Sequence, residues 1–366
     1  MTPGTGGGPG AARPVLAEPT RAVPIDHFSA VHLAAATART LARRCGLPGA
    51  LPDRAAVVAS ELASNIAKHA SGGSLYLQRL AHGEGLEIIA ADRGPGMREL
   101  ERCLTDGYTT TNTLGAGLGA IRRIATTLTI RTRAGTGTLV CARLAPPHRT
   151  TDAERPVGAL CLPAEGERHC GDAAAVACTD RGLTALAVDG LGHGAEAEEA
   201  ARAAVRCFHR MPDADLPDLF AAAHRALRHS RGAAIGVLRL RDDTVDYCGV
   251  GNVRVALLSP DDVVRRLSGQ PGVVGWNMPP PQVRRLGVPA GTTAVLHTDG
   301  VDQRWSRDPE PFLLRLPPPL LAAALVHGFR RSRDDATVVT AKSPQPRAPQ
   351  APQPKTPRIE TPQRPR

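Results

Sequence analysis

The sequence predicts an α+β fold in which two layered units follow one another along the chain, and three observations lead to this. Residues 27–91 carry two segments of helical periodicity followed by two of strand periodicity. Residues 157–258 place short strands first, two helices together and then strands again, as expected when helices cover a pair of sheets. Between these parts, segment 145–152 is polar, contains two prolines and follows neither periodicity, so we expect a boundary there.

The length of the chain sets the number of units. At 366 residues it has room for two units that each bury a core. We predict the first unit at 22–145 and the second at 157–342, with 146–156 as the linker. Residues 1–21 are rich in Gly and Pro, and residues 343–366 hold eight Pro and a net basic charge, so both ends are predicted to be disordered.

The composition narrows the classes of function. Aromatic residues make up only 3% of the chain, so the cores must be filled by Leu, Val, Ile and Ala. The formal net charge is +10, but residues 342–366 alone hold six Lys or Arg and one Glu. The folded part is therefore only mildly basic, and a nucleic-acid partner is not indicated. DNA binding by the basic tail would be salt-sensitive and would disappear when residues 343–366 are deleted.

The cysteines and the hydropathy pattern concern the compartment. Eight cysteines occur without a C-x-x-C or paired His spacing, which indicates neither a structural zinc site nor a disulfide framework. No charged start is followed by an apolar stretch, and no run of 18 apolar residues occurs, so we expect no signal peptide and no membrane span. These features predict a cytoplasmic protein with reduced thiols.

The first unit begins with two predicted helices. Apolar residues recur every three or four positions over 27–44, and Gly46 and Pro48 end that pattern. The second helix is predicted from Asp53, a residue suited to the N-cap position, to about Ala70.

The second helix carries a group of polar residues. Glu61 and Asn65 are four positions apart and therefore project from one face, and Lys68 and His69 come round on the same side. A solvated helix face is the ordinary explanation for a lone E-x-x-x-N pattern. A functional interpretation therefore depends on the segments further along the chain.

Glycine-rich segments come after the second helix. Residues 75–80 and 86–91 flank a short polar turn, as hairpin strands do, and the second strand runs into the segment Asp92-Arg93-Gly94-Pro95-Gly96. After a Thr-rich loop, Gly115-Ala116-Gly117-Leu118-Gly119 opens an apolar helix predicted over 120–128. Glycines at a helix start expose backbone N–H groups to phosphate oxygens. A Rossmann motif is excluded because no strand immediately precedes these glycines and Ala120 occupies the position of its last glycine.

The order E-x-x-x-N, D-x-G-x-G, G-x-G-L-G resembles the GHKL ATPases, and in detail the anti-sigma serine kinases of the RsbT/RsbW type, over about residues 22–145. The resemblance implies a GHKL-type α/β sandwich with ATP and Mg²⁺ as cofactors. Asn65 would bind the Mg²⁺, Glu61 would be the catalytic carboxylate that polarises the attacking hydroxyl, and Asp92 would accept from the adenine amino group. The other ATP-binding residues implied are Lys68, Gly94, Gly96, Gly115, Gly117, Leu118 and Gly119. No His-containing dimerisation helix precedes this unit, so a protein hydroxyl is the expected phosphate acceptor.

The second unit contains acidic residues beside its predicted strands. Strand 183–188 delivers Asp189 into a glycine-rich turn, where backbone carbonyls such as that of Gly190 can approach a divalent cation. Each acidic group taken singly also fits ordinary turn chemistry at a strand end. The other acidic groups beside strands are Asp172, Asp299 and the adjacent Asp334 and Asp335. Strands are predicted at 157–162, 173–178, 183–188, 233–240, 244–249, 253–258, 294–296 and 338–340, and helices at 196–209 and 215–228.

In this order the acidic groups resemble the metal-dependent serine/threonine phosphatases (PPM family), specifically the SpoIIE/RsbX branch, over about residues 157–342. The resemblance implies a PPM-type α-β-β-α sandwich and two Mg²⁺ or Mn²⁺ ions. Asp189 would be the catalytic residue that bridges the ions, with the Gly190 carbonyl on one ion. Asp299 and Asp334 would bind the other, and Asp172 would act through water.

Two assignments stay open at this point. Asp335 can replace Asp334 as the ligand, because the two are adjacent. His193 is a candidate catalytic residue that protonates the leaving group, and it is equally well explained as a structural histidine of the turn.

The two resemblances together imply a bifunctional regulator that writes and erases phosphate on serine or threonine. The implied partners are small STAS-domain antagonist proteins in the partner-switching control of sigma factors or stress responses, with a sigma factor or a regulatory phosphatase as a further candidate partner. The alternative keeps the phosphatase but makes the first unit a nucleotide-gated binding module without kinase turnover.

Overall fold

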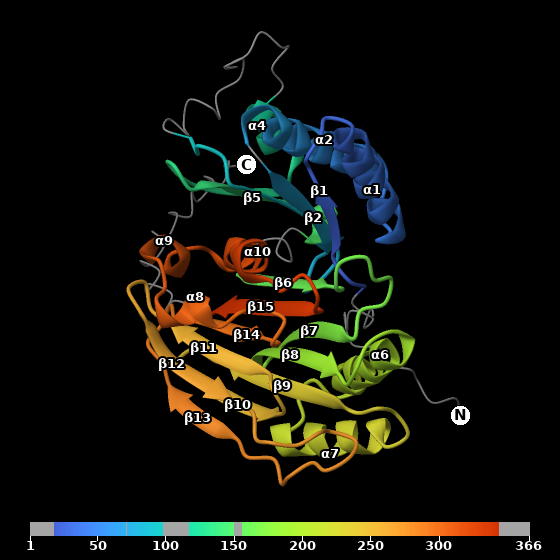
Figure 1. The fold of residues 1–366 in the computed structure, drawn as a ribbon, viewed down its shortest axis with the longest axis vertical. Coiled ribbons are helices and arrows are strands. Elements are labelled where there is room, and N and C mark those ends of the chain that lie inside the picture. The colour runs from blue at the N-terminus through green and yellow to red at the C-terminus, as the bar shows by residue number, and fades with distance from the viewer. Residues whose placement is uncertain (1–17, 71, 98–116, 150–155, 344–366) are drawn as a thin grey trace, which may run out of the picture.

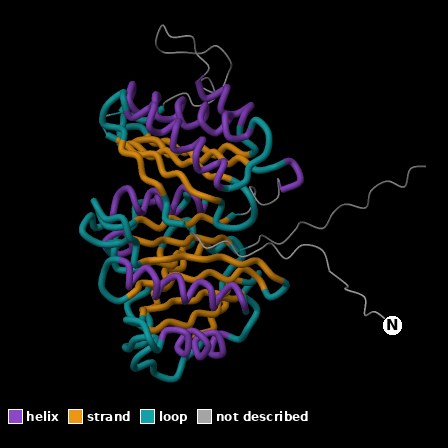
Figure 2. Tube along the Cα trace, turned by 90° about the vertical axis from the view of Figure 1, so that its right-hand side faces the viewer, coloured by secondary structure: helices purple, strands orange, loops and turns teal. Residues whose placement is uncertain are grey.

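A computed structural model of the chain describes residues 18–70, 72–97, 117–149 and 156–343. In this part, the strands form three five-stranded sheets in which all neighbouring strands pair antiparallel. Helices and sheets form layers along the long axis of the molecule, with two sheets directly next to each other in the second unit (Figures 1 and 2). None of the helices in the described ranges is long and apolar enough to cross a membrane.

The first sheet has the strand order β1-β2-β3-β5-β4 and is covered on one face by three helices (Figure 1). Apolar side chains of α1 and α2 point to the sheet at helical spacing, for example Ala34, Ala38 and Leu41, and join one buried core with the strands. The elements are β1 (Arg21–Pro24), α1 (Ala30–Arg44), α2 (Leu51–His69), β2 (Gly73–Arg79), β3 (Leu86–Asp92), α4 (Gly117–Ile124), β4 (Thr127–Arg133) and β5 (Gly137–Leu144).

The other two sheets stack face to face in the second unit. Their orders are β13-β10-β9-β8-β7 and β12-β11-β14-β15-β6, and a core rich in Val, Leu and Ala fills the space between them. Helices α6 and α7 cover the outer face of the first of these sheets, and α10 covers that of the second. This α-β-β-α order confirms the predicted architecture. The elements are β6 (Val157–Leu162), β7 (Asp172–Thr179), β8 (Gly182–Gly190), α6 (Ala195–Arg210), α7 (Leu216–Leu227), β9 (Ala233–Leu240), β10 (Thr244–Val250), β11 (Arg254–Leu258), β12 (Val263–Ser268), β13 (Arg284–Gly287), β14 (Thr293–His297), α8 (Arg304–Arg307), α9 (Pro311–Leu314), α10 (Pro318–Phe329) and β15 (Ala336–Lys342).

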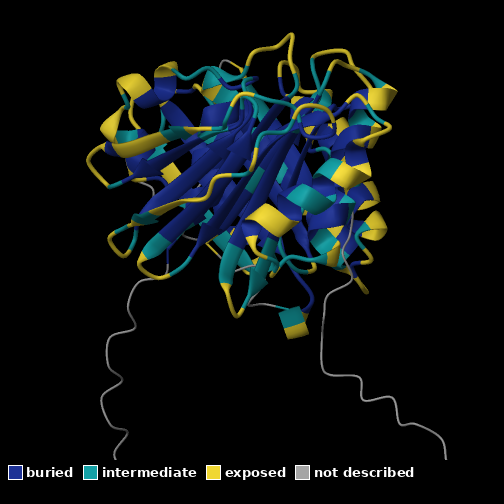
Figure 3. Cartoon of the chain, turned by 90° about the horizontal axis from the view of Figure 1, so that it is seen from below, coloured by how far each residue is buried: buried dark blue, intermediate teal, exposed yellow. Residues whose placement is uncertain are grey.

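Helix α10 lies between the two units and belongs to a core that both of them share. The outer face of the first sheet contributes Tyr76, Ile89 and Leu139 to this core, and α10 contributes Leu321 and Leu325. Most strand residues are buried, except in β1, β4, β12 and β13, and many exposed residues lie in loops and on outer helix faces (Figure 3). The first sheet is therefore covered on both faces, by its own helices and by the second unit.

Three features differ from the sequence-based expectations. The helix predicted over 120–128 ends at Ile124, and Thr127 already begins β4, because that segment pairs with β5 along its whole length. Strands β1, β4, β5, β12 and β13 and helices α8, α9 and α10 were not predicted. Residues 18–21, expected to be disordered, are placed: the backbone N–H of Thr20 donates to the Cys161 carbonyl at 2.7 Å. Residues 1–17 and 344–366, also expected to be disordered, lie outside the described residues.

Candidate functional site

An acidic cluster forms where the facing sheets of the second unit end. Asp172 at the start of β7 lies opposite Asp189 near the end of β8 in the strand register. Asp299 follows β14 and Asp334 precedes β15, and these two strands are also paired neighbours. Antiparallel pairing therefore brings together carboxylates that are far apart in the sequence.

Neighbouring polar side chains orient two of these carboxylates. The Asn252 amide donates to Asp189 Oδ2 at 2.9 Å, and the Thr298 hydroxyl donates to Asp172 Oδ2 at 2.7 Å. Asp172 is buried, whereas Asp189 is half-buried. The amide oxygen of Asn252 is itself buried, and no hydrogen-bond partner for it is found among the described residues.

The carboxylates repel one another. Burial and, after it, the charges of Asp299 and Asp334 raise the pKa of Asp189 to about 6, against the opposing effect of the hydrogen bond from Asn252. Burial and then the charge of Asp189 raise the pKa of Asp172 well above its usual value. Burial and the charge of Asp299 likewise raise the pKa of Asp334. A cluster of carboxylates that raise each other's pKa is a set of donors that a divalent cation would neutralise.

The adjacent residues Asp334 and Asp335 have different environments. Asp335 accepts from the backbone N–H of Ala164 through Oδ1 at 2.7 Å and from that of Gly171 through Oδ2 at 2.6 Å. Both of its oxygens therefore tie the loop after β6 and the start of β7 to the start of β15. Asp334 is exposed and has neither of these ties. This arrangement favours Asp334 over Asp335 as the metal ligand.

The chemistry of the donors fits a hard divalent ion, and the backbone supports it. Gly190 is buried at the end of β8, and a Cβ there would lie 2.4 Å from the Ala197 carbonyl oxygen, so only glycine fits. Among the described residues, however, no three His, Cys, Asp or Glu side chains stand as a ready-made ligand group. The candidate ligands Asp189, Asp299 and Asp334 would have to close around an ion by side-chain rotation.

His193 makes no hydrogen bond or ion pair with the acidic residues in the described part of the chain. It is an exposed residue of the turn between β8 and α6. The geometry thus adds no support for a catalytic role of His193.

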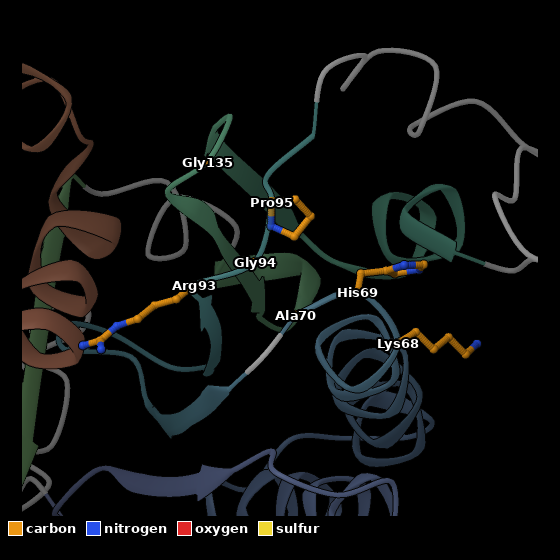
Figure 4. Close-up of a pocket in the computed structure, with 7 residues that line it drawn as sticks. All are labelled: Lys68, His69, Ala70, Arg93, Gly94, Pro95 and Gly135. Carbon is orange, nitrogen blue, oxygen red and sulfur yellow. The ribbon is translucent and has the colours of Figure 1, made fainter.

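The first unit holds a cavity of about 520 Å³ beside the end of α2 and the loop after β3 (Figure 4). Two residues implied by the kinase resemblance, Lys68 and Gly94, line it. Asn65 and Glu61 lie half-buried about one and two turns before Lys68 along α2 and are not among the lining residues of the cavity. The full lining is Lys68, His69, Ala70, Arg93, Gly94, Pro95 and Gly135.

Asp92 ends β3 at the rim of this region. Its Oδ1 accepts from the backbone N–H groups of Gly94 at 2.8 Å and Thr138 at 3.3 Å, and burial raises its pKa. Gly96 has φ of 72°, and a Cβ there would lie 2.4 Å from the Arg133 carbonyl oxygen. The loop after β3 therefore requires glycine at that position.

Of the predicted glycines around the start of α4, the structure describes Gly117 and Gly119. Gly117, with φ of 36°, begins α4, and Leu118 and Gly119 follow in its first turn, where they are buried. Gly115 lies outside the described residues. Helix α4 packs against α2, and its Leu118 and Ile121 belong to the same buried core as the apolar residues of α2.

Several residues of both sites were not assigned a role from sequence. Arg93 and Gly135 line the cavity, and Asn252 and Thr298 orient the carboxylates. Arg93 lies within a motif that was recognised, but its partner His327 and the partner of Asn252, Asp189, come from distant segments. Only the pairing of strands far apart in the sequence reveals these contacts.

Comparisons with known proteins agree with both halves of this description. Residues 27–144 match the family model "Histidine kinase-like ATPase domain", and residues 179–344 match "Stage II sporulation protein E (SpoIIE)". The serine/threonine-protein kinase RsbT of Bacillus subtilis is 34% identical over 106 residues, which cover 28% of this chain and 80% of RsbT. The phosphoserine phosphatase RsbX of the same organism is 27% identical over 147 residues, which cover 38% of this chain and 70% of RsbX.

Solved structures also align with the chain. RsbX in complex with magnesium aligns with a TM-score of 0.44 and 24% identity, covering 50% of this chain and 92% of that one. A structure from work on the bacterial stressosome as a modular system aligns with a TM-score of 0.46 and 28% identity, covering 50% and 97%. The sequence matches carry the assignment: the chain belongs to the histidine kinase-like ATPase family through a part homologous to RsbT, and joins it to a SpoIIE-family, metal-dependent protein serine/threonine phosphatase homologous to RsbX.

Proposed function

We propose that this protein is a partner-switching regulator that removes phosphate from serine or threonine of STAS-domain antagonist proteins and adds it with a kinase-like, ATP-binding unit. The observation that supports the proposal is the strand pairing, which opposes Asp172 and Asp189 and places Asp299 and Asp334 next to two neighbouring strands. The matches to RsbT and RsbX, one kinase and one phosphatase, support the pairing of the two activities in one chain.

The phosphatase site would use the chain's own residues to hold two Mg²⁺ or Mn²⁺ ions. Asp189 is the proposed bridge, with the Gly190 carbonyl, Asp299 and Asp334 as further ligands and Asp172 acting through water. When bound, such ions would activate a water molecule and offset the charge of the phosphate. Asn252 and Thr298 would keep the carboxylates of Asp189 and Asp172 in orientation through their hydrogen bonds.

The kinase-like unit would bind ATP between α2, the loop after β3 and the start of α4. In this proposal Asp92 accepts from the adenine amino group, Asn65 binds Mg²⁺ and Glu61 positions the attacking hydroxyl. The two backbone N–H groups that reach Asp92 both bond Oδ1, which leaves Oδ2 for the base. A positioned carboxylate is needed because a hydroxyl is a poor nucleophile at neutral pH.

The compartment and the partners belong to the same proposal. A cytoplasmic location gives the protein access to ATP and to STAS antagonists, and a sigma factor or a regulatory phosphatase is a further candidate partner.

A phosphorylation assay with a STAS protein tests both activities. The full chain is incubated with ATP, Mg²⁺ and the STAS protein, and phosphoserine and phosphothreonine are followed by mass spectrometry. Glu61→Ala should lose transfer but keep dephosphorylation, and Asp189→Ala should show the reverse. If Asp189→Ala still removes phosphate at the wild-type rate, the acidic cluster is not the hydrolytic site.

The second candidate function makes the first unit a binding module without turnover. It is favoured by the positions of Glu61 and Asn65, which do not line the cavity. In the same assay this alternative predicts ATP-dependent binding of the STAS protein with no phosphate transfer, and Glu61→Ala should then bind like the wild type.

A further inference from the structure

The two units are locked together by buried polar contacts as well as by their shared core. Glu87 on β3 and Arg143 on β5 form a buried ion pair with 2.6 Å between Oε2 and Nε. The Arg143 guanidinium also donates to the Val157 carbonyl, and the Gln78 amide donates to the Ala159 carbonyl, both on β6. Buried charges that are paired in this way tolerate little displacement. The units therefore do not rotate freely, and any signal between them must pass through local changes.

Arg93 connects the nucleotide cavity to α10. Arg93 is one of the residues that line the cavity, and its guanidinium donates to the His327 carbonyl near the C-terminal end of α10 at 3.1 Å. Figure 4 shows this side chain pointing away from Lys68 and His69 and toward the neighbouring helix. Arg93 directly follows Asp92, the proposed adenine-binding residue.

The end of α10 in turn holds the loop that carries Asp299. The backbone N–H of Asp302 donates to the Phe329 carbonyl at 2.9 Å, and that of Arg331 donates to the Gly300 carbonyl at 2.8 Å. The same turn leads to Asp334, whose N–H donates to the Arg331 carbonyl at 3.2 Å. Two of the proposed metal ligands are thus fixed by the residues at and just after the end of α10.

We propose that the nucleotide cavity is also an effector site of the phosphatase, with Arg93 as the switch. Arg93 has two alternative partners: the His327 carbonyl, or the phosphate groups of a nucleotide in the cavity that it lines. A guanidinium bonds an anion more strongly than a neutral carbonyl, so a bound nucleotide would draw Arg93 away from α10. The released end of α10 would hold the loops of Asp299 and Asp334 less firmly, and the phosphatase would bind its metal more weakly.

This inference rests on the proposed nucleotide binding. It predicts that the effect of bound nucleotide on the phosphatase is inhibitory. The phosphatase is weakened while the kinase-like unit has nucleotide bound, so one chain avoids adding and removing the same phosphate at once. Because coupling between binding sites is reciprocal, metal at the acidic cluster must lower nucleotide affinity by the same factor.

The test measures metal dependence with and without nucleotide. Hydrolysis of p-nitrophenyl phosphate by the full chain is titrated with Mn²⁺ at buffered free-metal concentrations, in the absence and presence of ADP. We expect ADP to raise the half-saturating Mn²⁺ concentration about fivefold. Arg93→Ala should show the raised value without ADP and no further response. Arg79→Ala is the matched control, because Arg79 donates in the same way to the Arg44 carbonyl at the end of α1, at 3.3 Å, away from α10.

A separate measurement of ADP binding, by displacement of a fluorescent nucleotide, separates two kinds of failure. If ADP binds but leaves the Mn²⁺ titration unchanged, the coupling is wrong and the nucleotide site stands. If ADP does not bind, the proposed nucleotide function fails, and Arg93→Ala still tests the link through α10. An Mn²⁺ titration of Arg93→Ala that coincides with those of the wild type and Arg79→Ala overturns the inference.

Discussion

The acidic residues of the second unit lie at the ends of two pairs of neighbouring strands, β7 with β8 and β14 with β15. The polar residues of the first unit lie along one helix and the loop after β3. In the acidic cluster the register opposes Asp172 and Asp189, and further hydrogen bonds orient both. In the first unit the cavity is lined by Lys68 and Gly94, while Glu61 and Asn65 stand back from it. Sheet register places side chains through many backbone bonds, but a helix face needs a loop or ligand to complete a site.

The largest difference between the two units should appear in the variant Asp189→Ala. Asp189→Ala should lower the phosphatase activity by about 100-fold or more, since it removes the proposed bridge between the ions. Nucleotide binding should be unchanged because Asp189 lies in the other unit. Mn²⁺-dependent hydrolysis and fluorescent-nucleotide binding measure the two outcomes, and a parallel loss of both would mean that the units cannot be treated separately.

A second difference separates Asp335 from Asp334. Asp335→Ala removes the acceptor of two backbone N–H groups and should lower the free energy of unfolding by roughly 2 to 3 kcal/mol. Asp334→Ala, at an exposed position, should leave metal-free stability nearly unchanged and weaken metal binding. Chemical denaturation without metal measures the first effect. Equal destabilisation by both substitutions would contradict the division of roles.

The stability of the protein should fall in acid because His327, at the interface between the two units, is half-buried. Burial, and then the charge of Arg93, lower the pKa of His327 to about 4 from a usual value of 6.5. The unfolded chain therefore takes up this proton first, so the stability is fully present above pH 6.5 and is lost as the pH falls toward 4. The full loss between pH 6.5 and pH 4 should be about 3 kcal/mol.

Denaturation of wild type and His327→Gln at pH 7.5 and pH 4.5 checks this expectation. His327→Gln should lose less stability on acidification than the wild type, and His32→Gln, an exposed position on α1, should behave like the wild type. An identical pH response of all three proteins would show that His327 is accessible to protons in the folded state.

The smallest effect is expected at the rim of the cavity. Asp92→Asn keeps an oxygen for the Gly94 N–H but can place an amide donor against the adenine amino group, and should weaken nucleotide binding about tenfold. Phosphatase activity without nucleotide should stay unchanged. Fluorescent-nucleotide titration measures the loss, and wild-type affinity in Asp92→Asn would remove this residue from the proposed adenine site.

Local patterns in the sequence were sufficient to predict most elements of the second unit. Strands β8 and β9 and helices α6 and α7 were predicted to within a few residues, because alternation and helical spacing are local properties. The acidic residues could be predicted as candidates because each stands beside a strand. Their pairing across strands could not, since register depends on the whole sheet.

Helix α10 shows the limit of that approach. It starts in a run of prolines, and its residues are buried on nearly all sides by β6, β15 and the first sheet, so it lacks the polar face that marks an amphipathic helix. Its place between the units, the tie from Arg93 to His327 and the choice between Asp334 and Asp335 all depend on contacts between distant segments. The sequence by itself determined the residue types available at each site, and the tertiary structure decided which of them meet, because burial and hydrogen bonding are settled only when distant strands and helices pack.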